Sequence, residues 1–345
     1  MRPTNVSSPS PTANRHRIPW GARIGLSLLI AAAGNFVPAG EIHVAPAGND
    51  QAAGSKEEPV ATLGRALELA KTGDLIRLAP GVYRGDVKTR VPGVEIAGSS
   101  ESIIRGPENK RGLQVLHDKT VLRGFVVEQT DIGIWLYGVS ECRLEDLTLR
   151  DLGGEGIRIK NQSHHNVVRK CSFARMGREG FDADRGRKNG EGIYIGTAPE
   201  QRSKNEPPNV PDRCHHNLVE DCTFATEAAE AVDIKEDSEE NTVRNCTGRD
   251  SRDPDGPVFG SRGDNNRFEA CIAIGGRGHG FRFGGDTVKA GKYGQQAERV
   301  YGKHNVMRNC RAERNAVWGI AEMVKPQDID DSNELADNGR GGRRP

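Results

Sequence analysis

Glu230-Ala-Val-Asp-Ile-Lys235 is one copy of a short pattern that recurs along the chain. Each copy has a leading residue that is usually polar, then Gly or Ala in most copies, then apolar residues separated by one variable position. The other copies begin at Ile132, Glu155, Glu191, His279 and Trp318, with a weaker copy at Asp255. Several copies follow one another by 23–25 residues, the length of one three-stranded coil, and the rest by 36 or 39. The pattern therefore predicts an all-β parallel solenoid with inserted loops.

A second repeat, Asn-x-apolar-x-x-Cys, runs in step with the first. Its copies begin at Asn166, Asn217, Asn241, Asn266 and Asn305. Asn tolerates left-handed backbone at a turn, so these side chains are expected to form an interior amide ladder from coil to coil. The Cys residues that close the copies are expected to stack as small apolar side chains, with occasional disulfides between adjacent coils as the alternative. Cys-x-x-Cys pairs are absent from the sequence, which argues against a zinc site.

Composition agrees with a repetitive β fold. The 345 residues include 43 Gly but only 5% aromatic residues, which suits short strands and tight turns. The 49 basic and 48 acidic side chains are interspersed, so the sequence lacks the basic patch of a nucleic-acid-binding protein. We expect a monomer.

The N-terminus has the features of an export signal. Arg15, Arg17 and Arg23 precede an apolar run over residues 24–33, and small residues near Ala39 offer a cleavage point. The run is too short to span a hydrocarbon layer of about 30 Å. We therefore expect a signal peptide over residues 1–39, no membrane span, and a secreted or periplasmic protein.

A short helix is expected before the coils begin. Leu63, Ala66, Leu67 and Ala70 follow helical spacing within residues 60–72, and Gly73 would end the helix. Such a helix would cover the open apolar end of a solenoid. We expect the β-helix domain to span residues 40–324 and residues 325–345 to form a polar, disordered tail.

Stacking the copies of the first pattern predicts three columns on the outer face, with a rise of about 4.8 Å per coil. In chain order the columns are Ile132, Glu155, Glu191, Glu230, Asp255, His279; Trp135, Arg158, Tyr194, Asp233, Val258, Arg282; and Tyr137, Lys160, Gly196, Lys235, Gly260, Gly284. Successive carboxylates in one column repel each other. Two arrangements would relieve this: an ion network with neighbouring basic side chains, or a calcium ion.

The calcium hypothesis assigns specific ligands. Glu191, Glu230 and Asp233 would offer the hard carboxylate oxygens that calcium prefers. Asp182 and Asp184, in the neighbouring insertion over residues 174–190, would add further ligands.

Long insertions also indicate where a substrate binds. The insertions over residues 197–215 and 285–304 each follow a copy of the first pattern directly, so they should rise from the same edge of the solenoid as walls of a groove. We expect Arg158, His279 and Arg282 to bind substrate there.

Two stretches resemble known families. Val44-Ala-Pro-Ala-Gly-Asn-Asp50, followed by Pro80-Gly-Val-Tyr83, resembles the opening of secreted right-handed parallel β-helix proteins of the pectate-lyase-like superfamily. The stretch from Glu230 to Asn245, with the following Val258-Phe-Gly-Ser-Arg262, is similar to the catalytic coils of the chondroitinase B and alginate lyase family.

The second resemblance implies roles for individual residues. Glu230 would bind calcium, Lys235 would be the catalytic base, and Arg262 would assist catalysis from the next coil. The family's first calcium-binding Glu falls on Ala228 here, so Asp233 or Glu191 would have to replace it.

These residues suit the β-elimination that cleaves a uronic-acid polymer. The reaction needs a group that neutralises the substrate carboxylate, a base for the C5 proton, and an acid for the leaving oxygen. Lys235 would be the base, Arg262 would stabilise charge, and Tyr194 would donate a proton or stack on a sugar. The alternatives are a non-catalytic carbohydrate-binding β-helix, and a glycoside hydrolase or epimerase on the same scaffold.

Overall fold

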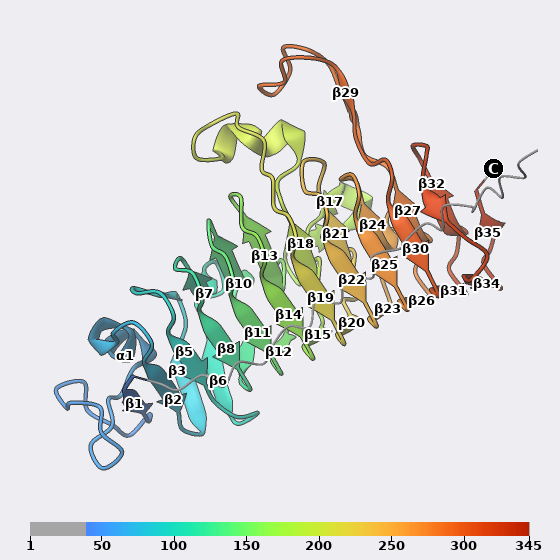
Figure 1. Cartoon of the computed structure of the whole chain (residues 1–345). Helices are drawn as coiled ribbons and strands as arrows, with labels where there is room; N and C mark the ends of the chain where they lie inside the picture. Colours follow the sequence, from blue (N-terminus) through green and yellow to red (C-terminus); the bar gives the residue numbers. More distant parts are fainter. Residues whose placement is uncertain (1–38, 345) are drawn as a thin grey trace, which may run out of the picture. The chain divides into compact units, whose positions relative to one another are not determined.

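The computed structural model describes residues 39–344, so the expected signal peptide lies outside the described residues except for Ala39. The described chain passes repeatedly through three parallel sheets, here named A, B and C in the order in which each coil visits them (Figure 1). Every pairing between neighbouring strands within these three sheets is parallel. The predicted all-β parallel solenoid is thereby confirmed.

Sheet A has 11 strands. They are β1 (Glu41–Val44), β2 (Leu75–Leu78), β5 (Glu95–Ala97), β8 (Val121–Arg123), β11 (Arg143–Glu145), β14 (Val167–Arg169), β19 (Leu218–Glu220), β22 (Thr242–Arg244), β25 (Arg267–Glu269), β30 (Val306–Arg308) and β33 (Asp328–Ile329).

Sheet B has 10 strands. They are β3 (Gly81–Arg84), β6 (Ser102–Arg105), β9 (Val126–Glu128), β12 (Thr148–Arg150), β15 (Ser172–Ala174), β20 (Thr223–Ala225), β23 (Thr247–Arg249), β26 (Ile272–Ile274), β31 (Arg311–Glu313) and β34 (Glu334–Ala336).

Sheet C also has 10 strands and contains every copy of the first repeat. They are β4 (Val87–Lys88), β7 (Arg111–Val115), β10 (Ile132–Tyr137), β13 (Ile157–Lys160), β18 (Ile193–Ile195), β21 (Val232–Ile234), β24 (Pro257–Ser261), β27 (His279–Phe283), β32 (Trp318–Glu322) and β35 (Gly341–Arg343).

The glycine of the first repeat is required by packing inside the coil. A Cβ at Gly192 would lie 2.4 Å from Cδ1 of Phe224 and 2.6 Å from the carbonyl oxygen of Ala231. The interior beside it is filled by stacked rings, with the centroids of Phe173 and Phe224 4.6 Å apart. The glycine therefore lets a large ring from sheet B close the core against sheet C.

The predicted amide ladder is present. Asn166 Nδ2 donates to Asn217 Oδ1 at 2.9 Å, Asn217 Nδ2 donates to Asn241 Oδ1 at 2.9 Å, and Asn241 Nδ2 donates to Asn266 Oδ1 at 3.1 Å. All seven cysteines are buried free thiols, which confirms the interior stack and not the disulfide alternative. Because each ladder amide is buried, its bonds to the coils above and below satisfy groups that water cannot reach.

The capping helix α1 (Leu63–Leu69) is shorter than expected. Its first turn is capped by the Thr62 hydroxyl, which accepts from the amide of Arg65 at 3.1 Å. It ends at Ala70, whose backbone is extended, and not at Gly73. The helix packs against β1, β2 and β4 and so covers the first coil, as predicted.

The prediction of a disordered tail from residue 325 is wrong. Strands β33, β34 and β35 complete a further coil, in which Trp318 pairs with Gly341 and Ile320 with Arg343. The polar sequence of this coil led to the wrong prediction. In the structure, Asn338 extends an amide ladder by accepting from Asn315 Nδ2 at 2.9 Å. Leu335 supplies an apolar residue that packs against the core.

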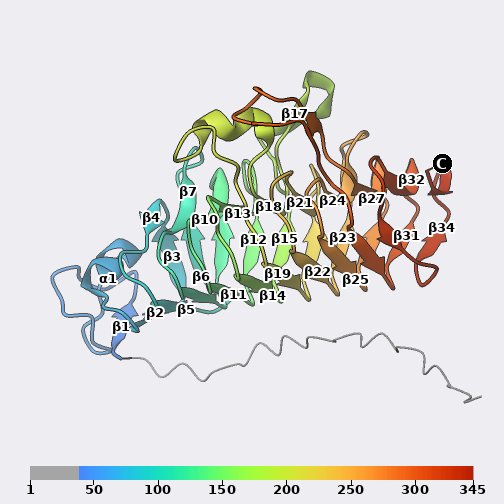
Figure 2. The same cartoon turned by 45° about the horizontal axis from the view of Figure 1, so that its top comes forward.

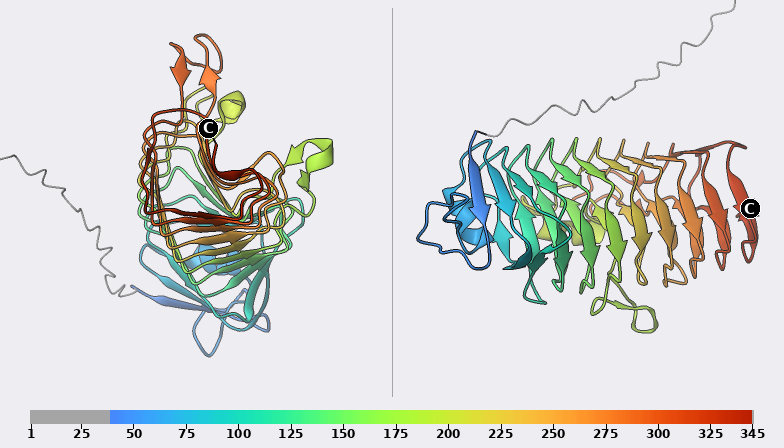
Figure 3. Two further views of the ribbon diagram at one scale, coloured as in Figure 1. Left: turned by 90° about the vertical axis from the view of Figure 1, so that its right-hand side faces the viewer. Right: turned by 90° about the horizontal axis from the view of Figure 1, so that it is seen from below.

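The insertions lie at the two ends of the strands of sheet C, and the one that contains β17 projects above the coils in Figure 2. Between sheets B and C lies the hairpin of β16 (Phe181–Asp182) and β17 (Arg187–Lys188), joined by the 3-10 helix η1 (Ala183–Arg185). Between sheets C and A lie the 3-10 helix η2 (Pro199–Lys204) and the hairpin of β28 (Thr287–Val288) and β29 (Arg299–Val300). Viewed along the solenoid axis, the insertions project on two sides (Figure 3).

Within the described residues, no helix is both long enough and apolar enough to cross a membrane.

Candidate active site on sheet C

The candidate site lies on the outer face of sheet C, where the middle strands carry charged residues at alternate positions. Tyr194 pairs with Asp233 in the next coil, Asp233 pairs with Gly260, and Gly260 pairs with Arg282. The alternating apolar residues of the same strands are buried in the core. The outward positions therefore form the columns that the repeat predicted.

The weak copy of the repeat is in a different register from the predicted one. Pro257, not Asp255, pairs with His279, and Phe259 points inward to stack on Phe281 at 5.4 Å between ring centroids. The two-residue shift follows from the inward packing of that ring, since a core position must hold an apolar side chain.

The shift also corrects the columns around Lys235. Gly260 takes the place predicted for Val258, and Val258 itself is buried in the column otherwise held by glycine or alanine. Because Ile234 pairs with Ser261, the next pair along these strands is Lys235 and Arg262. The resemblance implied that Arg262 assists Lys235 from the next coil, and the register places the two side by side.

Three carboxylates meet in the middle of the site. Ligand oxygens of Glu191, Glu230 and Asp233 lie within 4.8 Å of one another, and all three residues are buried. Asp233 is paired with basic side chains, whereas Glu191 and Glu230 form no ion pair with any described residue. Burial, together with Glu155 and Glu230, raises the pKa of Glu191 to about 8. Burial and Asp233 raise the pKa of Glu230 to about 7.

Basic groups surround Asp233. The Lys235 ammonium forms an ion pair with Asp233 Oδ2, and Arg262 Nε lies 3.8 Å from Asp233 Oδ1. Although burial opposes it, the charges of Lys235 and Arg262 hold the pKa of Asp233 below its usual value. Burial likewise opposes the charged form of Lys235, but Asp233 raises the pKa of that amine above its usual value.

Tyr194 lies between two cations. Arg158 Cζ is 3.7 Å and Lys235 Nζ is 4.4 Å from the centroid of its ring. Such contacts are attractive because the ring face is electron-rich. Burial raises the pKa of the Tyr194 hydroxyl to about 12, so this group keeps its proton at neutral pH. Arg158 also pairs with Glu155, which completes a charged layer around the tyrosine.

An aromatic and cationic surface continues the site toward the N-terminal coils. The rings of Trp135 and Tyr137 stack at 6.0 Å between centroids, and Arg111 Cζ lies 3.6 Å above the Trp135 ring. Lys160 Nζ is 6.0 Å from the same ring. Arg111 was not predicted as a site residue because it precedes the first clear copy of the repeat.

Glu236 is a further buried carboxyl group that the sequence reasoning did not select. Neither of its side-chain oxygens has a hydrogen-bond partner within residues 39–344, and Oε1 lies 4.0 Å from Arg262 Nη1. Burial raises its pKa. Its position directly after Lys235 is the one signal in the sequence that could have identified it.

Two predicted metal ligands lie apart from the carboxylate cluster. Asp182 caps η1 by accepting from the amide of Arg185 at 3.2 Å, and it pairs with Arg187 Nη2 at 3.2 Å. Asp184 is exposed within η1. Neither belongs to the group of carboxylates that could share a cation, so the structure does not bring them together with the other proposed ligands.

The residues present fit a hard divalent cation because they offer close carboxylate oxygens that lack basic partners. Glu191 and Glu230 bring two close carboxylates that no described basic side chain pairs with, beside the oxygens of Asp233. Calcium takes such oxygen ligands at about 2.4 Å and would relieve their repulsion. Glu191 Oε2 also accepts from the amide of Gly190 at 2.9 Å, which orients that carboxylate.

A buried arginine joins the insertions on one edge of the site. Arg202, in η2, has no exposed surface and pairs with Asp237, two residues after Lys235. The same nitrogen, Nη2, also donates to the Tyr301 hydroxyl at 2.9 Å, and Nη1 donates to the Tyr293 carbonyl oxygen at 3.2 Å. The two insertions that were expected to rise from this edge are thereby held to each other and to the end of β21.

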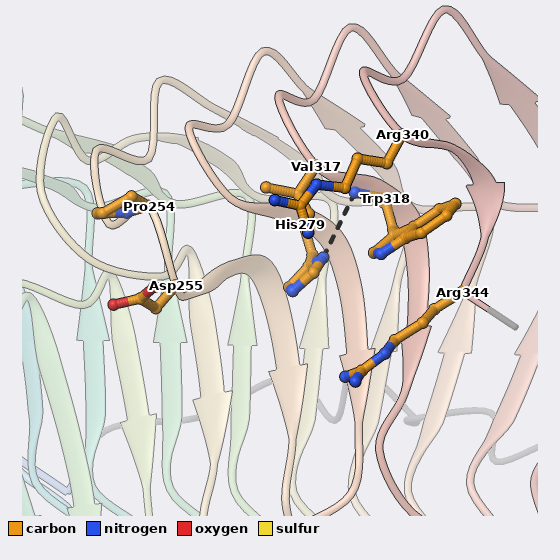
Figure 4. Close-up of a pocket in the computed structure, with 7 residues that line it drawn as sticks. All are labelled: Pro254, Asp255, His279, Val317, Trp318, Arg340 and Arg344. Carbon is orange, nitrogen blue, oxygen red and sulfur yellow. Dashed lines mark hydrogen bonds between the residues drawn. The ribbon is translucent and has the colours of Figure 1, made fainter.

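Of the predicted substrate-binding residues, Arg158 lies within the cluster and Arg282 lies beside it, one coil beyond Gly260. Burial and Arg262 lower the pKa of Arg282. His279 lies further along the sheet, in a hollow at its C-terminal coils. Its Nδ1 accepts from the amide of Trp318 at 3.4 Å (Figure 4).

Comparisons with known proteins identify the fold. A family described as "Right handed beta helix region" matches residues 210–341, and a family described as "Protein of unknown function (DUF1565)" matches residues 46–116. The fold is the right-handed, pectate-lyase-like β-helix. This confirms the predicted β-helix fold and its right hand. No curated protein sequence matches the chain.

Two solved structures share this β-helix over most of their length. An alginate lyase from Paenibacillus sp. str. FPU-7 is similar with a TM-score of 0.65 and 18% identity, covering 88% of this chain and 99% of that one. The pectate lyase Pel9A is similar with a TM-score of 0.58 and 13% identity, covering 89% of this chain and 82% of that one. At these identities the similarity concerns the fold, and the chemistry has to be argued from the site.

Proposed function

We propose that this chain is a secreted lyase that cleaves an acidic, uronic-acid-containing polysaccharide by β-elimination. The observation that carries the proposal is the register of sheet C, which brings Lys235, Arg262 and Tyr194 together beside three buried carboxylates. A base, a charge-stabilising cation and a proton donor are the three groups that the reaction needs. The two similar solved structures are described as an alginate lyase and a pectate lyase, which supports the same reaction class.

Lys235 is the proposed base. In its neutral form its amine would take the C5 proton of a uronate unit, and the electron pair would form the C4–C5 double bond as the bond from C4 to the leaving oxygen breaks. Tyr194 would give its proton to that oxygen. Lys235 Nζ lies 4.4 Å from the centroid of the Tyr194 ring. After the reaction the lysine ammonium would return a proton to the tyrosine.

Arg262 is the proposed partner of the substrate carboxylate. Its side chain is 26% exposed, whereas that of Lys235 is 7% exposed, so the arginine is the more accessible cation of the pair. A guanidinium presents several donors that fit a carboxylate in a bidentate arrangement. It would stabilise the charge that develops on the carboxylate when the C5 proton leaves.

Calcium is a proposed cofactor, held by Glu191, Glu230 and Asp233. When bound, it would supply positive charge near the substrate carboxylate. A bound calcium ion would also be coordinated by Asp233, which otherwise forms an ion pair with Lys235. The lysine would then lose the partner that favours its charged form.

An assay with several polymers tests the proposal. The protein would be incubated with polygalacturonate, alginate, glucuronan and chondroitin sulfate, with calcium or with a chelator, while the ultraviolet absorbance of the unsaturated product is followed. We expect a rise in absorbance on at least one polymer, and its loss in Lys235→Ala. Arg249→Ala, which removes an exposed cation on sheet B, is the matched control and should remain active.

Three results would contradict parts of the proposal. No absorbance rise on any polymer would refute lyase activity on this panel. New reducing ends without absorbance would indicate a hydrolase instead. Full lyase activity in Lys235→Ala would show that another group is the base.

A further inference from the structure

A cavity lies at the C-terminal coils of sheet C, apart from the carboxylate cluster. It has a volume of about 510 Å³ and is lined by Pro254, Asp255, His279, Val317, Trp318, Arg340 and Arg344 (Figure 4). Four of these residues come from the last two coils: Val317 and Trp318 at the start of β32, and Arg340 and Arg344 on either side of β35. The last coil, which the sequence suggested would be disordered, therefore builds one wall of this cavity.

The cavity has an excess of positive charge. Neither Arg340 nor Arg344 forms an ion pair with any described carboxylate. Among the described side chains, Arg344 donates a hydrogen bond only to the Met323 sulfur, at 2.8 Å. The carboxylate of Asp255 is engaged by Lys188, 3.1 Å away. Two guanidinium groups that lack a carboxylate partner at one cavity suit an anionic ligand.

The positive charges near the cavity also affect His279. Burial and the neighbouring Arg282, Arg344 and Arg340 lower its pKa to about 4. Its ring is therefore neutral at physiological pH. Because Nδ1 accepts from the amide of Trp318, the neutral ring carries its proton on Nε2, which leaves a donor for a ligand.

The cavity also has an aromatic surface. Trp318 is partly exposed, and its ring lies close to Gly341, where an added Cβ would be 3.1 Å from ring atom Cζ3. The glycine thus provides the space that the indole occupies. An aromatic face next to guanidinium groups can contact the apolar face of a sugar ring while the cations bind its acidic group.

The cavity lies in line with the proposed catalytic residues. Glu230, Pro257, His279 and Trp318 occupy equivalent positions in four successive coils of sheet C. At about 4.8 Å per coil, Trp318 is roughly 14 Å along the sheet from Glu230. One sugar ring cannot cover this distance, but a short oligosaccharide can.

We propose that this cavity binds the carboxylate of a uronate unit several sugars away from the bond that is cleaved. The proposal rests on the proposed function for the identity of its ligand. Trp318 would stack on the sugar ring, Arg340 and Arg344 would bind its carboxylate, and His279 would donate to a hydroxyl group. The cavity would anchor the polymer along sheet C without taking part in the chemistry.

Binding without turnover is the direct test. In a Lys235→Ala background, affinity would be measured by calorimetry for oligouronides of increasing length prepared from alginate and polygalacturonate. Carboxyl-reduced oligosaccharides of equal length serve as the neutral probe. We expect Arg340→Gln combined with Arg344→Gln to weaken binding of the longer oligouronides about tenfold or more, the range of two charge-assisted contacts. Trp318→Ala should weaken them as well.

Controls distinguish a loss of binding at the cavity from a general effect of removing positive charge and from misfolding of the variants. Arg311→Gln removes a partly exposed cation of the same coil from sheet B and should leave binding unchanged. The shortest oligouronides cannot reach from Lys235 to the cavity. They should therefore bind to the double variant and to its parent with equal affinity. Circular dichroism would confirm that each variant retains the β-helix.

The outcomes distinguish this inference from the proposed function. If the double variant loses affinity while the unsubstituted protein cleaves no polymer, the cavity binds uronates and the lyase proposal fails. If the protein is an active lyase but the double variant binds and turns over long substrates normally, the inference about the cavity is wrong. Failure of every oligouronide to bind would also overturn it.

Discussion

Asp233 is the residue through which the charges of the site are connected. It forms an ion pair with Lys235 and lies 3.8 Å from Arg262. It also belongs to the carboxylate cluster with Glu191 and Glu230. The charges of Lys235 and Arg262 hold the pKa of Asp233 below its usual value against the effect of burial, whereas burial raises the pKa of Glu191 to about 8 and that of Glu230 to about 7. Neighbouring carboxyl groups whose pKa values are moved in opposite directions are common in sites that perform acid–base chemistry.

Tyr194→Phe tests whether the Tyr194 hydroxyl group is the proton donor. The substitution removes the hydroxyl group but keeps the ring that contacts Arg158 and Lys235. We expect kcat to fall about 10²- to 10⁴-fold, the usual contribution of a general acid, while KM changes little. Steady-state kinetics on the best polymer would measure it. Tyr293→Phe, at an exposed ring, is the control, and equal effects of the two substitutions would contradict the assignment.

The raised pKa values of Glu191 and Glu230 predict a pH-dependent stability. Their folded-state values of about 8 and 7 lie above the ordinary value of 4.5, so the folded protein binds more protons than the unfolded chain between these limits. Their stabilising contribution is complete below pH 4.5 and is lost as the pH rises through 7 to 8. Without calcium, the melting temperature should therefore fall from about pH 6 to about pH 9.

Calcium should reverse this trend, because it binds the ionised carboxylates. We expect its effect on the melting temperature to be larger at alkaline than at acidic pH. Glu191→Gln should reduce both the pH dependence and the calcium effect. A melting temperature that responds to calcium equally at both pH values, or that is unaffected by Glu191→Gln, would argue against this site.

At the scale of the element, the turn between sheets C and A is stabilised by stacked side chains as well as by the backbone. His164 stacks on His215 and His165 on His216, each at 4.9 Å between ring centroids, next to the amide ladder. The ladder itself is buried. Its stability therefore depends on every amide having a partner in the neighbouring coil.

Asn217→Ala should destabilise the solenoid. The substitution removes the side-chain oxygen that accepts from the buried backbone amide of Asn166 and from its Nδ2, and it removes one of the two donors to Asn241 Oδ1. Each unpaired buried group costs about 1–3 kcal/mol, so we expect a loss of about 2–4 kcal/mol in the free energy of unfolding. Thermal and urea unfolding would measure it. Asn245→Gly, at an exposed turn with left-handed backbone, is the control and should have a much smaller effect.

At the scale of the whole molecule, the walls of the proposed groove depend on contacts between insertions that are far apart in sequence. Arg202 bonds to Asp237 and to the Tyr301 hydroxyl, which are 35 and 99 residues away. The pair is fully buried, and burial raises the pKa of Asp237. This contact holds the insertion walls next to the strand that carries Lys235.

Arg202→Met should loosen both insertions. Removing one partner of a buried ion pair typically costs about 3–5 kcal/mol, because the other charge stays buried. We expect faster proteolysis within residues 197–215 and 285–304, together with reduced activity. Arg202→Met combined with Asp237→Leu should be less affected than the single variant. Arg185→Met, at an exposed position in η1, is the control. Unchanged proteolysis in Arg202→Met would contradict this role.

The coil architecture and the centre of the candidate site could be predicted because both depend on local periodicity. A repeat of apolar and polar residues determines which side chains face the core, and stacking then places Glu191 next to Glu230 and Tyr194 next to Asp233. The ligand roles of Asp182 and Asp184 could not be judged in this way. They lie in an insertion whose conformation depends on contacts such as that of Asp182 with Arg187.

By itself, the sequence determined the solenoid, its amide ladder and the carboxylate column, because each follows from residues that recur at the spacing of one coil. Only the tertiary structure decided that Arg262 lies beside Lys235. That register depends on Val258 filling the core opposite Gly248, where an added Cβ would be 2.5 Å from Val258 Cγ1. The tertiary structure likewise decided that Arg340 and Arg344 share a cavity with His279. Such contacts depend on packing between coils, which no local pattern specifies.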